Sequence, residues 1–478
     1  MVCEAGCSQS ISDLKIEEKE EMARTFKLEP REVAKVNTKW RKIATMIPVP
    51  ESIPALEKLR KYEPVSMSGQ PLVVWDRGEG CNIYDRWGNK WLDWSSGVVV
   101  ANAGHGRKEI IDAIVKQATH GLLHNYCFPS EVRGNLAEKL VGLAPKGIDK
   151  CFILTTGAET TECALKLTRT HGHKVGGKKK NVMVSFENAF HGRTLGAQMM
   201  GGMGKQKTWI LNHDLEIVQI PFPDGFWNTD TNFKTAFLGK LAEKGVTPDR
   251  VAGVITESFQ GAGADFAPAE YMQELRAWCD EHNIVLTMDE VQAGFGRSGK
   301  FWSFEHYGIV PDLICMGKGI SSSLPISGLM GKAKIMDLYG PNEMTSTHTG
   351  NPVCSVAAMA SIDIIVKEKL VQNAEKMGKI LHAGLDKVAK KHADVVGVHH
   401  GKGMVAGLAI VKPGTKEKDG DLAWDIVNAC VEKGLLMFAP VGGSTVKIAP
   451  PLMSPQDAIE EGLEVLEEAF TAALGMRK

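Results

Sequence analysis

Short, continuously apolar runs alternate with amphipathic stretches through the middle of the chain. The runs lie at 151–154, 182–184, 217–220, 251–255, 284–288 and 313–316. Unbroken apolarity is what a parallel strand buried on both faces requires, because neither row of side chains meets water. Helical patterns at 158–171 and 271–282 lie between such runs. This alternation predicts a doubly wound α/β domain.

The regions on either side of this alternation have different patterns. Short antiparallel strands are predicted at 73–75, 82–84 and 91–94. Prolines punctuate 47–71, which is typical of an irregular connecting segment. Beyond residue 350 the pattern predicts two long helices, followed by a strand at 404–410 and helices at 421–433 and 455–474.

Composition and charge exclude several classes of protein. The 478 residues carry 56 Lys and Arg against 57 Asp and Glu, without the basic excess of a nucleic-acid-binding protein. No run of 18 apolar residues is present, and the acidic residues 1–22 resemble neither a secretory signal nor a mitochondrial presequence. Ten cysteines form no disulfide framework, and Cys3 and Cys7 are interpreted as exposed thiols in a flexible tail. We therefore expect a soluble, cytoplasmic protein without a metal site.

Three strand ends carry residues that could perform chemistry, since ligands of open parallel sheets bind beyond the carboxyl ends of strands. After 151–154, the N–H groups of Gly157 and Ala158 open a helix and could hold an anion; a plain helix cap is the alternative. Asp289 follows 284–288 and could hold a proton on a heterocyclic nitrogen, or form a cap or salt bridge. Lys318 follows 313–316 between two glycines and could form a Schiff base, or be a solvated loop lysine. Together, a phosphate cradle, a carboxylate and a nucleophilic amine are what pyridoxal phosphate requires.

One further motif suggests a dinucleotide cofactor, but the residues around it do not match the usual context of that motif. Residues 294–299 match G-x-G-x-x-G, the pattern of a dinucleotide-binding loop. Such a loop should leave its strand directly and open an apolar helix, whereas residues 289–293 intervene here and no helix start follows. A nicotinamide cofactor is therefore not expected.

Four ordered motifs resemble those of the class III (ω-amino-acid) pyridoxal-phosphate aminotransferases. They are DEVQAGFGRSGK at 289–300, FHGRT at 190–194, CMGKG at 315–319 and THTGNP at 347–352. The resemblance extends from about Val73 to the end of the chain. It implies a fold-type-I enzyme in which a mostly parallel seven-stranded sheet forms a large domain beside a smaller α+β domain. On this basis we expect an N-terminal arm and connecting segment at 1–70, small-domain residues at 71–105 and 350–478, and the cofactor-binding domain at 106–349.

The resemblance also implies roles for individual residues. Lys318 would form the Schiff base and then move the substrate proton, while Asp289 would pair with the pyridinium nitrogen. Gly157 and Ala158 would hold the phosphate, joined by Thr347 of the partner subunit in a homodimer with shared active sites, whose pairing into a tetramer is left open. The remaining cofactor-binding residues implied are Phe190 and Val291 on the two ring faces, Gln292 near the phenolic oxygen, and His191 and Glu257 beside them.

Two departures from the family pattern concern the substrate. Many members have an arginine that binds the α-carboxylate, and our alignment places His400 at that position. The glutamate that gates this arginine corresponds to Ala262. Arg193 could bind a distal acid group of the substrate as a bidentate fork, or serve a structural role. Val98 suggests an open, apolar pocket, and Trp94 is a further candidate for its wall.

The expected activity is the transfer of an amino group from a primary amine or ω-amino acid to a small 2-oxo acid, by a ping-pong Schiff-base mechanism. A decarboxylase, racemase or aminomutase of the same fold is one alternative. A binding or structural protein that retains an inactive fold is another, although the intact Lys318 and Asp289 argue against it.

Overall fold

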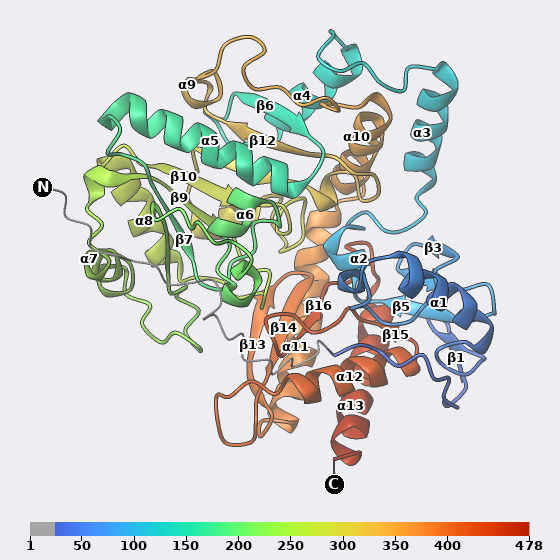
Figure 1. The fold of residues 1–478 in the computed structure, drawn as a ribbon. Helices are drawn as coiled ribbons and strands as arrows, with labels where there is room; N and C mark the ends of the chain where they lie inside the picture. The colour runs from blue at the N-terminus through green and yellow to red at the C-terminus, as the bar shows by residue number, and fades with distance from the viewer. Residues whose placement is uncertain (1–23, 478) are drawn as a thin grey trace, which may run out of the picture.

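The computed structural model describes residues 24–477 (Figure 1). The predictions for the acidic segment 1–22 and for Cys3 and Cys7 lie outside the described residues. Within 24–477, no helix is both long enough and apolar enough to cross a bilayer.

A seven-stranded sheet forms the core of the larger, upper part of the molecule (Figure 1). In spatial order its strands are β6 (Lys150–Leu154), β12 (Ser327–Gly331), β11 (Leu313–Met316), β10 (Val285–Asp289), β9 (Val251–Glu257), β7 (Val182–Phe186) and β8 (Ile217–Ile220). All neighbouring pairs are parallel except the two that β12 makes with β11 and β6. The prediction of a mostly parallel seven-stranded sheet is therefore confirmed.

Helices pack on both sides of this sheet and at its edge. The long helix α5 packs across β7, β9, β10, β11 and β12 (Figure 1). The helices of this region are α3 (Lys108–His120), α4 (Glu131–Gly142), α5 (Gly157–Gly176), α6 (Leu195–Met200), α7 (Lys240–Glu243), α8 (Ala269–Glu281), α9 (Ala333–Met336) and α10 (Pro352–Lys367). Every residue of β7, β9, β10 and β11 is buried, which explains why these strands are mostly apolar.

A second sheet lies near the N-terminus, and this region differs from the prediction in one strand and in the segment 47–71. Its order is β1 (Val36–Asn37), β2 (Lys42–Ile43), β5 (Lys90–Asp93), β4 (Asn82–Tyr84) and β3 (Arg77–Glu79), with β15 (Leu435–Leu436) also beside β5. The strand predicted at 73–75 is wrong, because β4 pairs instead with β3 across a turn where Gly80 has a φ of 58°. The segment 47–71 is not wholly irregular, since it contains α1 (Ile53–Tyr62). Pro54 lies in the first turn of α1, where its missing N–H breaks no helical hydrogen bond.

The C-terminal part of the chain combines helices with a small sheet. The antiparallel strands β13 (Val396–Lys402), β14 (Val405–Ile410) and β16 (Thr445–Ile448) pack with α11 (Leu370–Lys391) and α12 (Gly420–Glu432). The final helix α13 (Gln456–Gly475) packs on α11 and α12.

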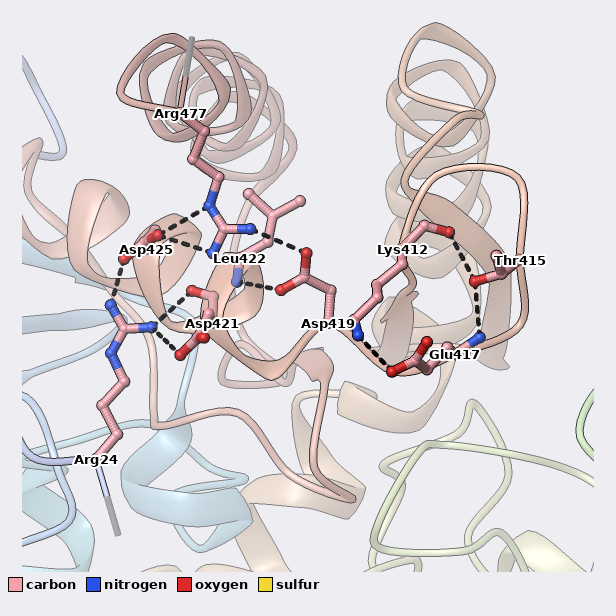
Figure 2. Close-up of polar contacts among 9 residues, drawn as sticks. All are labelled: Arg24, Lys412, Thr415, Glu417, Asp419, Asp421, Leu422, Asp425 and Arg477. Carbon is pink, nitrogen blue, oxygen red and sulfur yellow. Dashed lines mark hydrogen bonds and ion pairs between the residues drawn. The ribbon is translucent and has the colours of Figure 1, made fainter. Parts of the chain in front are cut away.

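Both ends of the described chain attach to α12 by ion pairs (Figure 2). Arg24 contacts Asp421 at 2.8 Å and Asp425 at 2.5 Å. Arg477 contacts Asp425 at 3.1 Å and Asp419, the N-cap of α12, at 2.9 Å. Because these pairs are partly exposed, each is expected to contribute at most about 1 kcal/mol. They place the first and last described residues beside the same helix.

Candidate active site

A cavity of about 480 Å³ lies at the carboxyl ends of the central strands. Its lining comes from the segments that follow β6, β7, β10 and β11 and from the last residue of β9. The residues singled out from the sequence that line it are Gly157, Ala158, Phe190, His191, Arg193, Glu257, Asp289, Val291, Gln292 and Lys318. Residues from five strand ends thus meet in one place, as expected for an open parallel sheet.

The N-terminus of α5 forms one end of the cavity. Thr156 caps this helix, and Glu159 completes a capping box by accepting hydrogen bonds from the N–H groups of Thr155 (2.8 Å) and Thr156 (2.9 Å). The next N–H groups are those of Gly157 and Ala158. A Cβ atom at position 157 would lie 2.8 Å from Val291, so glycine is needed for this close approach. The 20-residue helix therefore presents its positive end to the cavity, where an anion such as a phosphate is favoured.

A buried carboxylate and an imidazole, those of Asp289 and His191, line the cavity. Asp289 is the last residue of β10, and its Oδ2 lies 2.8 Å from Nδ1 of His191 while its Oδ1 accepts from the N–H of Val291 at 3.0 Å. Burial disfavours the charged imidazole, but the hydrogen bond to Asp289 and the charge of that residue outweigh it, so the pKa of His191 is raised. His191 thus orients Asp289, and both residues line the cavity.

Lys318 follows β11 and has a left-handed backbone conformation, with a φ of 43°. Such strain in a non-glycine residue is common at functional sites. Burial lowers the pKa of its amine, although Asp289 and Glu257 partly offset this effect. Among the described residues, the amine has no hydrogen-bond or ion-pair partner. A lowered pKa increases the fraction of free amine at neutral pH, which is the nucleophilic form.

Glu257 connects two loops of the site. Its carboxylate accepts from the N–H of Phe190 at 3.0 Å and from the N–H of Gly261 at 2.8 Å. Burial raises its pKa to about 7. Glu257 therefore fixes the loop that carries Phe190 and the loop that follows β9.

Four residues singled out from the sequence do not line this cavity within the described chain: Trp94, Val98, Thr347 and His400. Trp94 is fully buried in the core, where α13 passes so closely that a Cβ at Gly462 would lie 2.2 Å from the indole. Val98 and Thr347 are exposed. His400 lies on β13 and pairs through Nδ1 with the carboxylate of Asp265.

The glycine-rich segment 294–299 forms turns and does not start a helix. Arg297 within it is fully buried and donates to the carbonyl oxygens of Met404 (2.9 Å) and Pro450, and to Oδ1 of Asn102 (2.7 Å). The segment therefore holds separate parts of the chain together.

Sequence reasoning missed Lys447, which lies on β16 and is 1% exposed. Its Nζ donates to the carbonyl oxygen of Gly261 at 2.7 Å and to Oε1 of Gln292, directly behind the cavity wall. A single lysine between Val446 and Ile448 was the available signal, because an unpaired buried charge is costly. Sequence reasoning also missed the apolar wall formed by Leu324, Pro325 and Ile326.

Comparisons of sequence and of structure with known proteins both lead to aminotransferases. The sequence model of the class III aminotransferases matches residues 65–470. A probable 4-aminobutyrate aminotransferase of Bacillus subtilis is 32% identical over 425 residues, which cover 85% of this chain and 94% of that protein. An isoleucine 2-epimerase of Lentilactobacillus buchneri is 30% identical over 413 residues, covering 84% and 90% respectively. The pyridoxal-phosphate-bound crystal structure of an amine transaminase from an uncultivated Pseudomonas species superimposes with a TM-score of 0.79 at 28% identity, covering 84% of this chain and 95% of that one.

The cavity fits pyridoxal phosphate, the cofactor of this family. The first turn of α5 offers backbone N–H groups to a phosphate, Asp289 offers a carboxylate to a ring nitrogen, and Lys318 offers an amine to an aldehyde. Together with the match over 65–470, this arrangement shows that the chain belongs to the class III aminotransferases, the pyridoxal-phosphate-dependent enzymes of fold type I.

Proposed function

We propose that the protein transfers an amino group from a primary amine or ω-amino acid to a small 2-oxo acid of the pyruvate or 2-oxoglutarate type, by a ping-pong mechanism. The observation that carries this proposal is the position of Lys318, whose amine shares one cavity with Asp289 and the N-terminus of α5. Val100, Leu324 and Ile326 supply apolar lining, which suits the carbon chain of an amine.

Each residue has a role that follows from its place in the cavity. Bound there, pyridoxal phosphate supplies an aldehyde that condenses with amines and a ring that withdraws electrons. Lys318 would carry the proton to and from the substrate carbon, since its lowered pKa allows the amine to act as a base near neutral pH. Asp289 would hold a proton on the ring nitrogen, and Phe190 and Val291 would enclose the ring between them.

A panel of amines, followed by the visible absorbance of the cofactor-loaded protein, tests this proposal. Suitable donors should bleach the band stoichiometrically, and a 2-oxo acid should restore it, because a ping-pong enzyme stores the amino group between its two half-reactions. A racemase, which the similarity to an isoleucine 2-epimerase makes the second candidate, would invert an amino acid without releasing a 2-oxo acid. A decarboxylase would release carbon dioxide, and an aminomutase would move the amino group within one molecule. Any of these three outcomes without restoration by a 2-oxo acid would contradict the proposal.

Arg193 is proposed to bind the distal acid of an ω-amino acid. It lines the cavity, is exposed, and is held by Gln206 Oε1 at 3.2 Å while its guanidinium lies 5.5 Å from the centre of the Phe190 ring. Arg193→Gln is expected to raise KM for an ω-amino acid by about tenfold or more, because a bidentate charged contact is lost. KM for an unsubstituted amine of the same length should not change. An equal rise for both substrates in steady-state assays would assign Arg193 a structural role.

We also propose a homodimer with shared active sites, in which Thr347 would reach the phosphate site of the partner subunit. Helix α3 and the loop after it expose large apolar side chains, including Ile111 (49%), Val115 (54%), Leu123 (53%) and Phe128 (72%). An apolar surface of this kind is typical of an interface. The segment 1–70 is expected to cover the partner, and its deletion should then reduce oligomer size or cofactor retention.

Placing a charge in the centre of this apolar surface tests the dimer. Val115→Glu is expected to shift the protein towards monomer in sedimentation velocity and to weaken retention of pyridoxal phosphate, because a carboxylate would be desolvated at the interface. Val175→Glu, on an exposed valine of α5, is the matched control and should sediment like the wild type. A Val115→Glu protein that sediments as the wild type does would place the interface elsewhere.

A further inference from the structure

Lys447 is buried in a position that a lysine rarely occupies. It is 1% exposed, and it lies on β16, an edge strand of the small sheet, where it is paired with Gly407 of β14. It forms no ion pair with any described residue. Its ammonium instead donates to two oxygens, the backbone carbonyl of Gly261 at 2.7 Å and Oε1 of Gln292.

The chemistry of an ammonium group fixes the orientation of the Gln292 amide. An ammonium can only donate hydrogen bonds, so the oxygen of the amide must face Lys447. The amide NH₂ group is then available on the other side of the side chain. Gln292 lines the cavity, whereas Lys447 does not, so this donor belongs to the wall of the active site.

We infer that Lys447 is a positioning residue, which holds the amide of Gln292 so that its NH₂ group serves as a donor to an anionic oxygen in the cavity. The acceptor with the matching chemistry is the phenolic oxygen of the cofactor. Without the ammonium, the amide could rotate by 180° and direct its own oxygen at that anion, which would repel it. The orientation of one side chain thus depends on a charge that comes from a different sheet.

A purely structural role explains the burial of Lys447 poorly. Methionine has a similar length and would fill the same space without the cost of removing a charge from water. Burial lowers the pKa of Lys447 to about 7. The charges of Glu257 and Asp265 oppose this change, whereas those of Lys318 and Arg297 add a smaller decrease. The protein therefore keeps a lysine at a place where, among the described residues, its only side-chain hydrogen bond is to Gln292 of the active-site wall, with the centre of the Phe259 ring 5.3 Å from its Nζ.

The pH titration of the visible absorption band of the resting, cofactor-loaded enzyme provides a test that does not depend on turnover. Lys447→Met is expected to raise the midpoint of this titration by about half a pH unit or more, because a cation and an oriented donor that both favour the anionic oxygen are lost. Lys447→Arg keeps the charge and the donors, and should restore most of the shift. The midpoint for Lys447→Met remaining at the wild-type value would overturn the inference.

A double-mutant cycle separates positioning from direct contact with the substrate. If Lys447 acts through Gln292, adding Lys447→Met to Gln292→Leu should change the midpoint, the cofactor affinity and KM little further. If Lys447 contacts the substrate itself, the second substitution should raise KM as much in the Gln292→Leu background as in the wild type, and the inference fails. Thermal unfolding of the cofactor-free variants is the control for folding, and Lys447→Met should be at least as stable as the wild type.

Discussion

Replacing Lys318 by alanine is expected to lower kcat for transamination by about 10³- to 10⁵-fold and to abolish the visible band of the resting cofactor-loaded protein. Among the described residues that line the cavity, Lys318 has the only primary amine that could form a Schiff base with an aldehyde, and its lowered pKa suits both nucleophilic attack and proton transfer. Water and small amines in solution could replace only a small part of that function. Initial rates with a donor identified by the amine panel, together with the absorbance spectrum, measure both effects.

Two further variants keep this result interpretable. Lys318 has a φ of 43°, where alanine is strained but glycine is not, so Lys318→Gly removes the amine without that strain. Lys334→Ala, on an exposed lysine of α9, is a matched control and should retain wild-type activity. If Lys318→Gly kept a tenth of the wild-type rate, the assignment of the nucleophile would be wrong. A fold that had lost its activity in evolution would show no difference between any of these variants.

The sequence predicts the central strands well because their environment is uniform. β11 begins and ends where its apolar run does, since all four of its residues are buried and none is polar. The limits predicted for β8 also match, although this edge strand is only partly buried and contains Gln219. β12 was not recognised, because Gly328 and Gly331 break its apolar run. Packing favours glycine at both positions, as a Cβ at 328 would lie 2.7 Å from Met316 and one at 331 would lie 2.4 Å from Leu313. Such constraints come from neighbouring strands and leave no periodic signal.

The same reasoning separates the parts of the site that local sequence predicts from those it does not. Asp289 and Lys318 were identified because the ends of parallel strands converge at one edge of a sheet. Lys447 was missed because its place behind Gln292 depends on how the C-terminal sheet packs against the central one, which no local pattern encodes. Thr347 is exposed in a single chain, so its predicted role requires a second copy that one sequence cannot position.

Asp289→Asn is expected to lower kcat by about 10²- to 10⁴-fold while changing KM much less. Asparagine has the same shape and its oxygen can still accept a hydrogen bond, but it carries no charge to hold a proton on a ring nitrogen. That proton matters most when electrons flow into the ring, so its loss raises the transition state more than the bound substrate. Asp337→Asn, on an exposed aspartate that pairs with Lys150, is the matched control and should behave as the wild type.

A variant of the neighbouring His191 distinguishes whether the loss of kcat arises from the charge of Asp289 or from its geometry. His191→Phe removes the 2.8 Å contact to Asp289 but leaves the carboxylate, so it should lower kcat by about tenfold, much less than Asp289→Asn does. If geometry alone mattered, Asp289→Asn would be the milder variant, because the amide can keep the contacts to His191 and the N–H of Val291. The order of the two kcat values in steady-state assays therefore distinguishes the explanations. A larger loss in His191→Phe would show that orientation of the carboxylate, and not its charge, is what the reaction requires.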